Sequence, residues 1–183
     1  MAMSNLERVG KALELLRAGL APFADRELQT AAKNGAISPQ NLRAFLDDPL
    51  LAKKPPSEWD AAALLRLMWE TWNEVFRNTL GHAERSLTSE LRDVRNKWAH
   101  QQPFSSDDTD RALDSVERLL TAVSAPQADE VRRLKMDLRR LVFDEQVRTE
   151  KRRSAGGSIE SQAATQIEER RVGKECRSRW SPY

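Results

Sequence analysis

Apolar residues recur at steps of three and four along most of this 183-residue chain, and that spacing restricts it to folds built from α-helices. The N-terminal stripe consists of Leu6, Val9, Leu13, Leu16, Leu20 and Phe23. Ser4 and Glu7 precede it with the spacing of a capping box, which predicts a helix start. Pro22 either bends this helix or begins a second one, which would run to about Ala32. Such a narrow stripe fits a core-facing helix or a dimer interface.

Two further helices are expected in the next third of the chain. A short one runs from Pro39 to Asp47, and a long one runs from its N-cap, Ser57, to about Leu80. The long helix carries a broad inward stripe made of Leu64, Leu65, Met68, Trp69, Trp72, Val75 and Phe76. Tryptophans can stack nucleobases, but at helical spacing among leucines they are more typical of a core.

The region after residue 104 combines apolar stripes with a basic run. A cap within residues 105–108 and the proline at position 126 open two helices. The second is expected to bury Val131, Leu134, Leu138 and Leu141. Residues 132–153 hold nine basic and four acidic side chains. This run either contacts phosphates or forms a solvated face, which is the more common outcome.

Composition narrows the possible classes of protein. Charged residues make up 32% of the chain and aromatic residues 6%, with only seven glycines, which favours a helical bundle over a sheet protein. The net charge of +2 comes from residues 168–183, so a nucleic-acid interface must be a local patch. No apolar run approaches the roughly 18 residues that span a bilayer, and no signal peptide is visible. We therefore expect a cytoplasmic protein with no membrane partner.

The C-terminal sequence suggests three parts. We expect a helical domain over residues 1–153 and a flexible linker over residues 154–168, which opens with Ser-Ala-Gly-Gly-Ser. Residues 169–183 resemble a translated sequencing-adapter tail, so they are predicted to be foreign to the natural protein. The only cysteine, Cys176, lies there, and one cysteine supports neither an internal disulfide nor a cysteine-based zinc site.

The segment 84–100 is the one place where the sequence points to chemistry. Its apolar stripe consists of Leu87, Leu91, Val94 and Trp98. We expect this helix to end at His100, because Pro103 follows closely. Arg95, Asn96 and His100 then stand together in its last two turns. A five-residue step rotates by about 140°, so Arg95 and His100 face differently but can border one groove.

Arg95-Asn96-Lys97-Trp98-Ala99-His100 resembles the R-N-x-x-x-H signature of the HEPN superfamily of small helical domains. Residues 4 to about 150 resemble the branch found in a nuclear endoribonuclease of messenger-RNA surveillance. The same branch occurs at the N-termini of large bacterial ATP-binding proteins of defence-type loci. The resemblance implies an all-α bundle of five to six main helices that forms a homodimer, with two motifs facing each other across a cleft.

The resemblance also implies metal-independent cleavage of RNA, with no cofactor. His100 would act as general acid or base, Arg95 would hold the scissile phosphate, and Asn96 would orient the phosphate or the imidazole. The attack needs a ribose 2′-hydroxyl, so DNA should be inert. Gln102 stands where nucleotidylation-regulated HEPN toxins have a tyrosine, which argues against that kind of regulation.

An alternative interpretation assigns no turnover to these residues. Arg95 would pair with Asp93 or Glu90, and His100 would simply be a histidine favoured by the helix dipole. The domain would then be a dimerisation or RNA-binding module at the N-terminus of a larger ATP-dependent protein. The predicted linker leads us to expect that an ATPase domain follows this domain in the same polypeptide.

Overall fold

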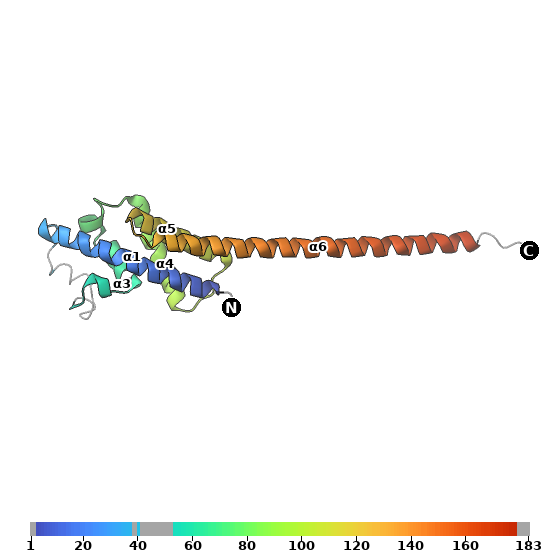
Figure 1. The fold of residues 1–183 in the computed structure, drawn as a ribbon, viewed down its shortest axis with the longest axis horizontal. Helices are drawn as coiled ribbons and strands as arrows, with labels where there is room; N and C mark the ends of the chain where they lie inside the picture. The colour runs from blue at the N-terminus through green and yellow to red at the C-terminus, as the bar shows by residue number, and fades with distance from the viewer. Residues whose placement is uncertain (1–2, 38–39, 41–52, 179–183) are drawn as a thin grey trace, which may run out of the picture. The chain divides into compact units, whose positions relative to one another are not determined.

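The computed structural model describes residues 3–37, 40 and 53–178, with side chains described as far as residue 154. Its elements are α1 (Asn5–Lys33), the 3₁₀ turn η2 (Pro56–Glu58), α3 (Ala61–Glu70), the π-helix η3 (Trp72–Phe76), α4 (His82–Ala99), α5 (Ser106–Ala122) and α6 (Ala128–Ser178). No strand occurs among these described residues (Figure 1), which confirms the predicted all-α class. Apart from Gln40, the helix expected from Pro39 to Asp47 falls outside them.

Helix α1 begins with the predicted capping box. The Ser4 hydroxyl accepts from the backbone N–H of Glu7 at 3.3 Å, and the Glu7 carboxylate accepts from the backbone N–H of Ser4 at 2.7 Å. The helix continues without interruption through Pro22, so no second helix starts there. α1 approaches α5 closely at Gly19, where an added Cβ would collide with Leu120 and lie 2.9 Å from the Cβ of Ala125. Only glycine fits this contact.

The long helix expected from Ser57 to Leu80 is instead broken into parts. Ser57 lies in η2, and Asp60 caps α3 by accepting from the backbone N–H of Ala63 at 2.8 Å. α3 ends before Thr71, whose buried hydroxyl donates to the carbonyl of Leu67 at 2.8 Å. Side-chain bonds of this kind disturb the helical ladder, and the π-helix η3 follows directly. The spacing of apolar residues predicts neither the later helix start at Asp60 nor the break at Thr71.

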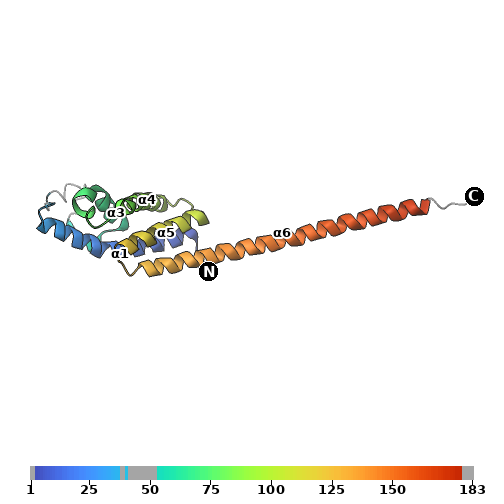
Figure 2. The same cartoon turned by 90° about the horizontal axis from the view of Figure 1, so that it is seen from above.

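The core lies between four helices. α1 packs against α3, α4 and α5, and α4 packs against both α3 and α5 (Figures 1 and 2). Every core helix contributes fully buried leucines, which include Leu16, Leu20, Leu64, Leu65, Leu91, Leu113 and Leu119. Each such side chain contributes about 1.5–3 kcal/mol relative to full exposure. Trp72 is buried as expected, whereas Trp69 is only half-buried.

Helix α6 belongs to two compact units, divided between Arg139 and Arg140. In the first unit Val131 and Leu138 are buried as predicted and Leu134 is half-buried. Leu141 is 46% exposed, so its predicted burial is wrong. It lies in the second unit, and the spacing of apolar residues along one helix does not show which of them other helices cover. The predicted linker, 154–168, is helical within α6, and the predicted domain bounds stay a prediction. No helix among the described residues is long and apolar enough to cross a bilayer.

Candidate functional site

Helix α4 ends where the sequence predicts. The backbone N–H of His100 donates to the carbonyl of Asn96 at 3.1 Å, which closes the last turn. Gln101 then adopts a positive φ of 54°, and Pro103 follows two residues later. A left-handed residue and a nearby proline are common signals that stop a helix. His100 is therefore the C-cap of α4.

The apolar stripe of α4 is buried only in its first half. Leu87 and Leu91 lie in the core, whereas Val94 and Trp98 are half-buried, so the prediction that all four belong to the core is only partly correct. Trp98 lies against α1 at Gly10, where an added Cβ would be 2.9 Å from the indole Nε1. The contact holds the end of α4 against α1.

Arg95 lies on the side of α4 that faces α3. Its guanidinium donates to the carboxylate of Asp60 at 3.3 Å, and 31% of its side chain is exposed. The other carboxylate oxygen of Asp60 caps α3, so one aspartate serves both helices. The partner of Arg95 is therefore neither Asp93 nor Glu90. Because 61% of the Asp60 side chain is exposed, this ion pair can exchange readily with solvent or with a bound anion.

Asn96 and His100 both lie on the exposed face of α4. They are four residues apart, so they are neighbours on one side of the helix. Neither side chain makes a hydrogen bond or ion pair to any residue that the structure describes. The structure thus brings Asn96 and His100 together, and it places Arg95 on a different flank of the helix.

Arg92 stands four residues before Asn96, in the same row as Asn96 and His100. Its guanidinium carbon lies 5.4 Å from the ring centroid of Trp69, and that of Arg85 lies 5.1 Å from the same ring. Both distances are within the range of cation–π interactions. Neither arginine has a carboxylate partner among the described residues, and the Nε of Arg85 is buried without a hydrogen-bond acceptor.

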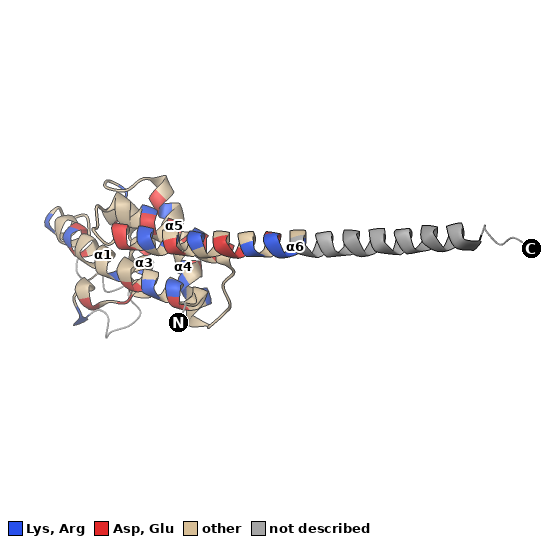
Figure 3. Ribbon diagram, turned by 45° about the vertical axis from the view of Figure 1, so that its right-hand side comes forward, with Lys and Arg blue, Asp and Glu red and all other residues tan. Residues whose placement is uncertain are grey.

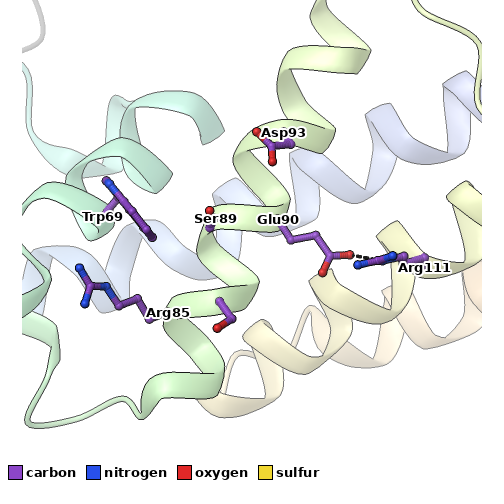
Figure 4. A pocket seen from close by; sticks show the side chains of 7 residues that line it. Trp69, Arg85, Ser89, Glu90, Asp93 and Arg111 are labelled. Atoms are coloured by element: carbon purple, nitrogen blue, oxygen red, sulfur yellow. Dashed lines mark hydrogen bonds and ion pairs between the residues drawn. The ribbon is translucent and has the colours of Figure 1, made fainter.

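An open groove of about 720 Å³ lies beside this cluster, between α3, α4 and α5. Its lining consists of Trp69, Arg85, Ser86, Ser89, Glu90, Asp93 and Arg111. Figure 4 shows Trp69 and Arg85 on one side and the Glu90–Arg111 pair on the other. Arg111 donates to Glu90 at 2.7 Å, and this hydrogen bond lowers the pKa of Glu90 and raises that of Arg111. We call this the α3–α5 groove.

A model of the Swt1-like HEPN family matches residues 11–124, which is more than half of the chain. The chain belongs to the Swt1-like HEPN family. The match extends from α1 to just past α5 and includes Arg95, Asn96 and His100. No solved structure and no curated protein matches the chain.

The basic run of this HEPN protein begins with an ion-pair ladder between α5 and α6. Figure 3 marks the basic residues of the ribbon in blue and the acidic residues in red. Arg139 donates twice to Asp110, at 2.7 and 2.9 Å. Lys135 donates to Asp114 at 2.9 Å and also contacts Glu117, which accepts from Arg132 at 2.8 Å. At least three of the nine basic residues, Arg132, Lys135 and Arg139, are therefore neutralised by carboxylates of α5. This part of the run fits neither a solvated face nor a free phosphate-binding surface.

The ladder shifts the protonation of its carboxylates. The hydrogen bonds from Arg139 lower the pKa of Asp110. Partial burial raises the pKa of Glu117, but the hydrogen bonds from Lys135 and Arg132 outweigh burial, so the net shift is downward. Both carboxylates are held in the charged form. The ladder therefore acts as a structural clamp between α5 and the first turns of α6.

The arrangement at the end of α4 suits proton transfer and the binding of an anion. It offers an imidazole and a carboxamide without partners in the described part of the chain, with a guanidinium in an exposed ion pair. Within the described residues, no three His, Cys, Asp or Glu side chains gather in a way that could hold a metal ion. The sequence interpretation missed Trp69, Arg85 and Arg92. The row from Arg92 to His100 was visible in the spacing, whereas the position of Trp69 depends on how α3 packs.

Proposed function

We propose that this HEPN domain is an RNA endonuclease that uses Arg95, Asn96 and His100 and needs no metal ion. The observation that supports it best is the exposed pair Asn96 and His100. Both side chains lack a partner among the residues that the structure describes and stand exposed at the end of α4, so the described part of the fold does not use them for stability. Membership of the HEPN family supports the same proposal.

The reaction proposed is attack of a ribose 2′-hydroxyl on the adjacent phosphodiester. A bond forms between the 2′-oxygen and phosphorus, and the bond from phosphorus to the 5′-oxygen breaks. The 2′-hydroxyl proton passes to a base, and the leaving 5′-oxygen takes up a proton from an acid. His100 can serve in either role. The products are a 2′,3′-cyclic phosphate and a 5′-hydroxyl end.

Arg95 would stabilise the negative charge of the phosphorane-like transition state. To do so its guanidinium must leave Asp60. Exposed ion pairs contribute about 0–1 kcal/mol, so this exchange costs little. Asn96, next to His100 on the same face, would orient the phosphate or the imidazole by hydrogen bonding.

The complete site would be formed by a homodimer. Ser86, Ser89, Asp93, Asn96 and His100 follow one another at steps of three and four along the outer face of α4. A two-fold axis near this row would bring two copies of His100 to one cleft, one as acid and one as base. The row contains no large apolar side chain, so the dimer would draw its buried area from neighbouring surfaces.

The test is cleavage of an end-labelled, structured RNA by the full chain in the presence of EDTA. The wild-type protein should produce cyclic phosphate ends, and His100→Ala should not. A matched DNA of the same sequence should remain intact, because it lacks the attacking hydroxyl. Equal rates for the wild type and His100→Ala would refute the proposal.

A second candidate is a non-catalytic dimerisation or RNA-binding module within a larger ATP-dependent protein. The ion pair between Arg95 and Asp60 favours it, since the guanidinium is engaged within the domain. The context would be phage defence or RNA surveillance, as in the HEPN branch that the sequence resembles. RNA binding without cleavage would support this candidate. A monomer in light scattering at micromolar concentration would count against both.

A further inference from the structure

Two arginines of α4 share one tryptophan of α3. Arg85 and Arg92 are seven residues apart, which is about two helical turns, and both guanidinium groups lie within 5.4 Å of the Trp69 ring centroid. Two cations held at the same indole repel each other. A bound anion between them would remove that repulsion and satisfy their N–H donors.

The other arginines that contact α4 or link α5 to α6 differ from this pair. Arg95, Arg111, Arg132 and Arg139 each have a carboxylate within 3.3 Å. Arg85 and Arg92 have none among the described residues, and the buried Nε of Arg85 lacks any hydrogen-bond acceptor. A buried donor without an acceptor is unfavourable unless a ligand supplies one. The free donors therefore point to an anionic ligand.

The two arginines lie on the same helix as the candidate cleavage site, so an anion bound to them would lie near His100. Arg92, Asn96 and His100 follow one another at four-residue steps, so they form a single row along α4. A polyanionic strand lying along this row would pass from Arg92 to His100, about 12 Å further along the helix. Trp69 adds a half-buried indole beside the first part of that path. Arginine together with an exposed aromatic face is the usual combination for binding single-stranded nucleic acid.

The α3–α5 groove adds a constraint on where the phosphates can lie. The negative charge of Glu90 is balanced by Arg111, whereas Asp93 has no cationic partner among the described residues. Asp93 would repel a phosphate, so the strand should run along the Arg85–Arg92 side. Ser89 lies between the two sides and can donate a hydrogen bond (Figure 4).

We propose that Trp69, Arg85 and Arg92 form a subsite that binds single-stranded RNA next to the candidate cleavage site. The guanidinium groups bind phosphates, and the indole, once the guanidinium groups move to the phosphates, stacks a base. The subsite rests on the proposed function only for the location of the cleaved bond.

The experiment measures binding of a fluorescent single-stranded oligoribonucleotide to the full chain carrying His100→Ala, which prevents cleavage. Adding Arg85→Gln and Arg92→Gln should weaken binding at least ten-fold at moderate salt. The slope of log affinity against log salt should fall by about 0.7 for each phosphate that the variant no longer neutralises. Trp69→Leu should weaken binding and leave this slope unchanged. Asp93→Asn should strengthen binding.

The control is Arg118→Gln with Arg133→Gln, which removes two exposed positive charges from α5 and α6. This double variant should change the affinity for RNA by less than two-fold. Circular dichroism and thermal melting check that every variant is folded. An equal loss of affinity in the control, or an unchanged affinity in the Arg85/Arg92 variant, would overturn the subsite.

The two proposals can fail separately. If the wild-type chain does not cleave RNA but the Arg85/Arg92 variant still binds RNA more weakly, the nuclease proposal fails and the subsite stands. If the wild type cleaves and the Arg85/Arg92 variant binds as tightly as its parent, the subsite fails and the nuclease stands.

Discussion

The α5–α6 ladder and the row Arg92, Asn96 and His100 of α4 are both made of charged and polar side chains, but these side chains are paired in the ladder and unpaired in the row. In the ladder, Arg132, Lys135 and Arg139 all meet carboxylates of α5. In the row, Arg92 has no carboxylate partner, and Asn96 and His100 have no internal hydrogen bond or ion pair among the described residues. Paired charges stabilise the fold, and unpaired ones remain available for a ligand. The difference predicts which substitutions change stability and which change activity.

The largest expected effect comes from the row. His100→Ala should lower the rate of RNA cleavage by a factor of about 10²–10⁴, the range typical of removing a general acid or base. Because the imidazole is exposed and has no partner among the residues that the structure describes, the free energy of unfolding should change by less than about 0.5 kcal/mol. Single-turnover cleavage and urea unfolding of the same protein measure the two quantities. A destabilised variant would show that the imidazole has a structural role.

Substitutions in the ladder should lower the stability of the fold and leave the activity of the folded protein unchanged. Lys135→Met keeps most of the aliphatic stem but removes the ammonium group that Asp114 and Glu117 share. Glu117 is largely buried, so this change should lower the free energy of unfolding by about 1–3 kcal/mol, with Arg132 compensating in part. Arg118→Met, an exposed control on α5, should change it by less than about 0.5 kcal/mol. The cleavage rate of Lys135→Met should fall only as far as its folded fraction falls. A larger fall would show that the ladder also contributes to activity, contrary to its structural role.

Acid should weaken the ladder, because its carboxylates stabilise the fold only in the charged form. The pKa values of Asp110 and Glu117 are lowered from their ordinary 3.8 and 4.5, so the folded state binds fewer protons than the unfolded chain in this range. The stabilisation is complete above about pH 4.5 and is lost as the pH falls through the lowered pKa values. Denaturant unfolding between about pH 6 and pH 3 should show this decrease. Asp110→Asn should make the dependence shallower, and an unchanged profile would contradict the assignment.

The sequence predicted the fold well because most of the fold follows from local signals. The capping box at Ser4, the apolar stripe of α1 and the end of α4 at His100 all depend on residues that are near one another in the chain. The break at Thr71 was missed, since a single hydroxyl bond to Leu67 decides it within an otherwise helical pattern. Leu141 was misplaced because burial depends on contacts with other helices, which the spacing along one helix does not show.

The candidate site was predicted in part for the same reason. Asn96 and His100 are local to one helix, and their shared face follows from their spacing. The partner of Arg95 is Asp60, thirty-five residues earlier, and no local pattern connects the two. Trp69 meets Arg85 and Arg92 only through the packing of α3 on α4. Contacts between helices therefore mark the limit of the sequence interpretation.

The smallest expected effect concerns Arg95, which is intermediate between the paired ladder and the unpaired row because its ion pair with Asp60 is exposed. Asp60→Asn removes the charge that holds the guanidinium but keeps a side chain that caps helices well. The free energy of unfolding should change by less than about 1 kcal/mol. In Asp60→Asn the Arg95 guanidinium no longer has to leave the Asp60 carboxylate in order to bind a phosphate. If Arg95 binds the scissile phosphate, the variant should therefore have a KM for RNA that is a few-fold lower and a nearly unchanged kcat. The double variant Asp60→Asn with Arg95→Gln should lose that gain. An unchanged KM in Asp60→Asn would show that Arg95 has a structural role, like the arginines of the ladder, and does not bind the scissile phosphate.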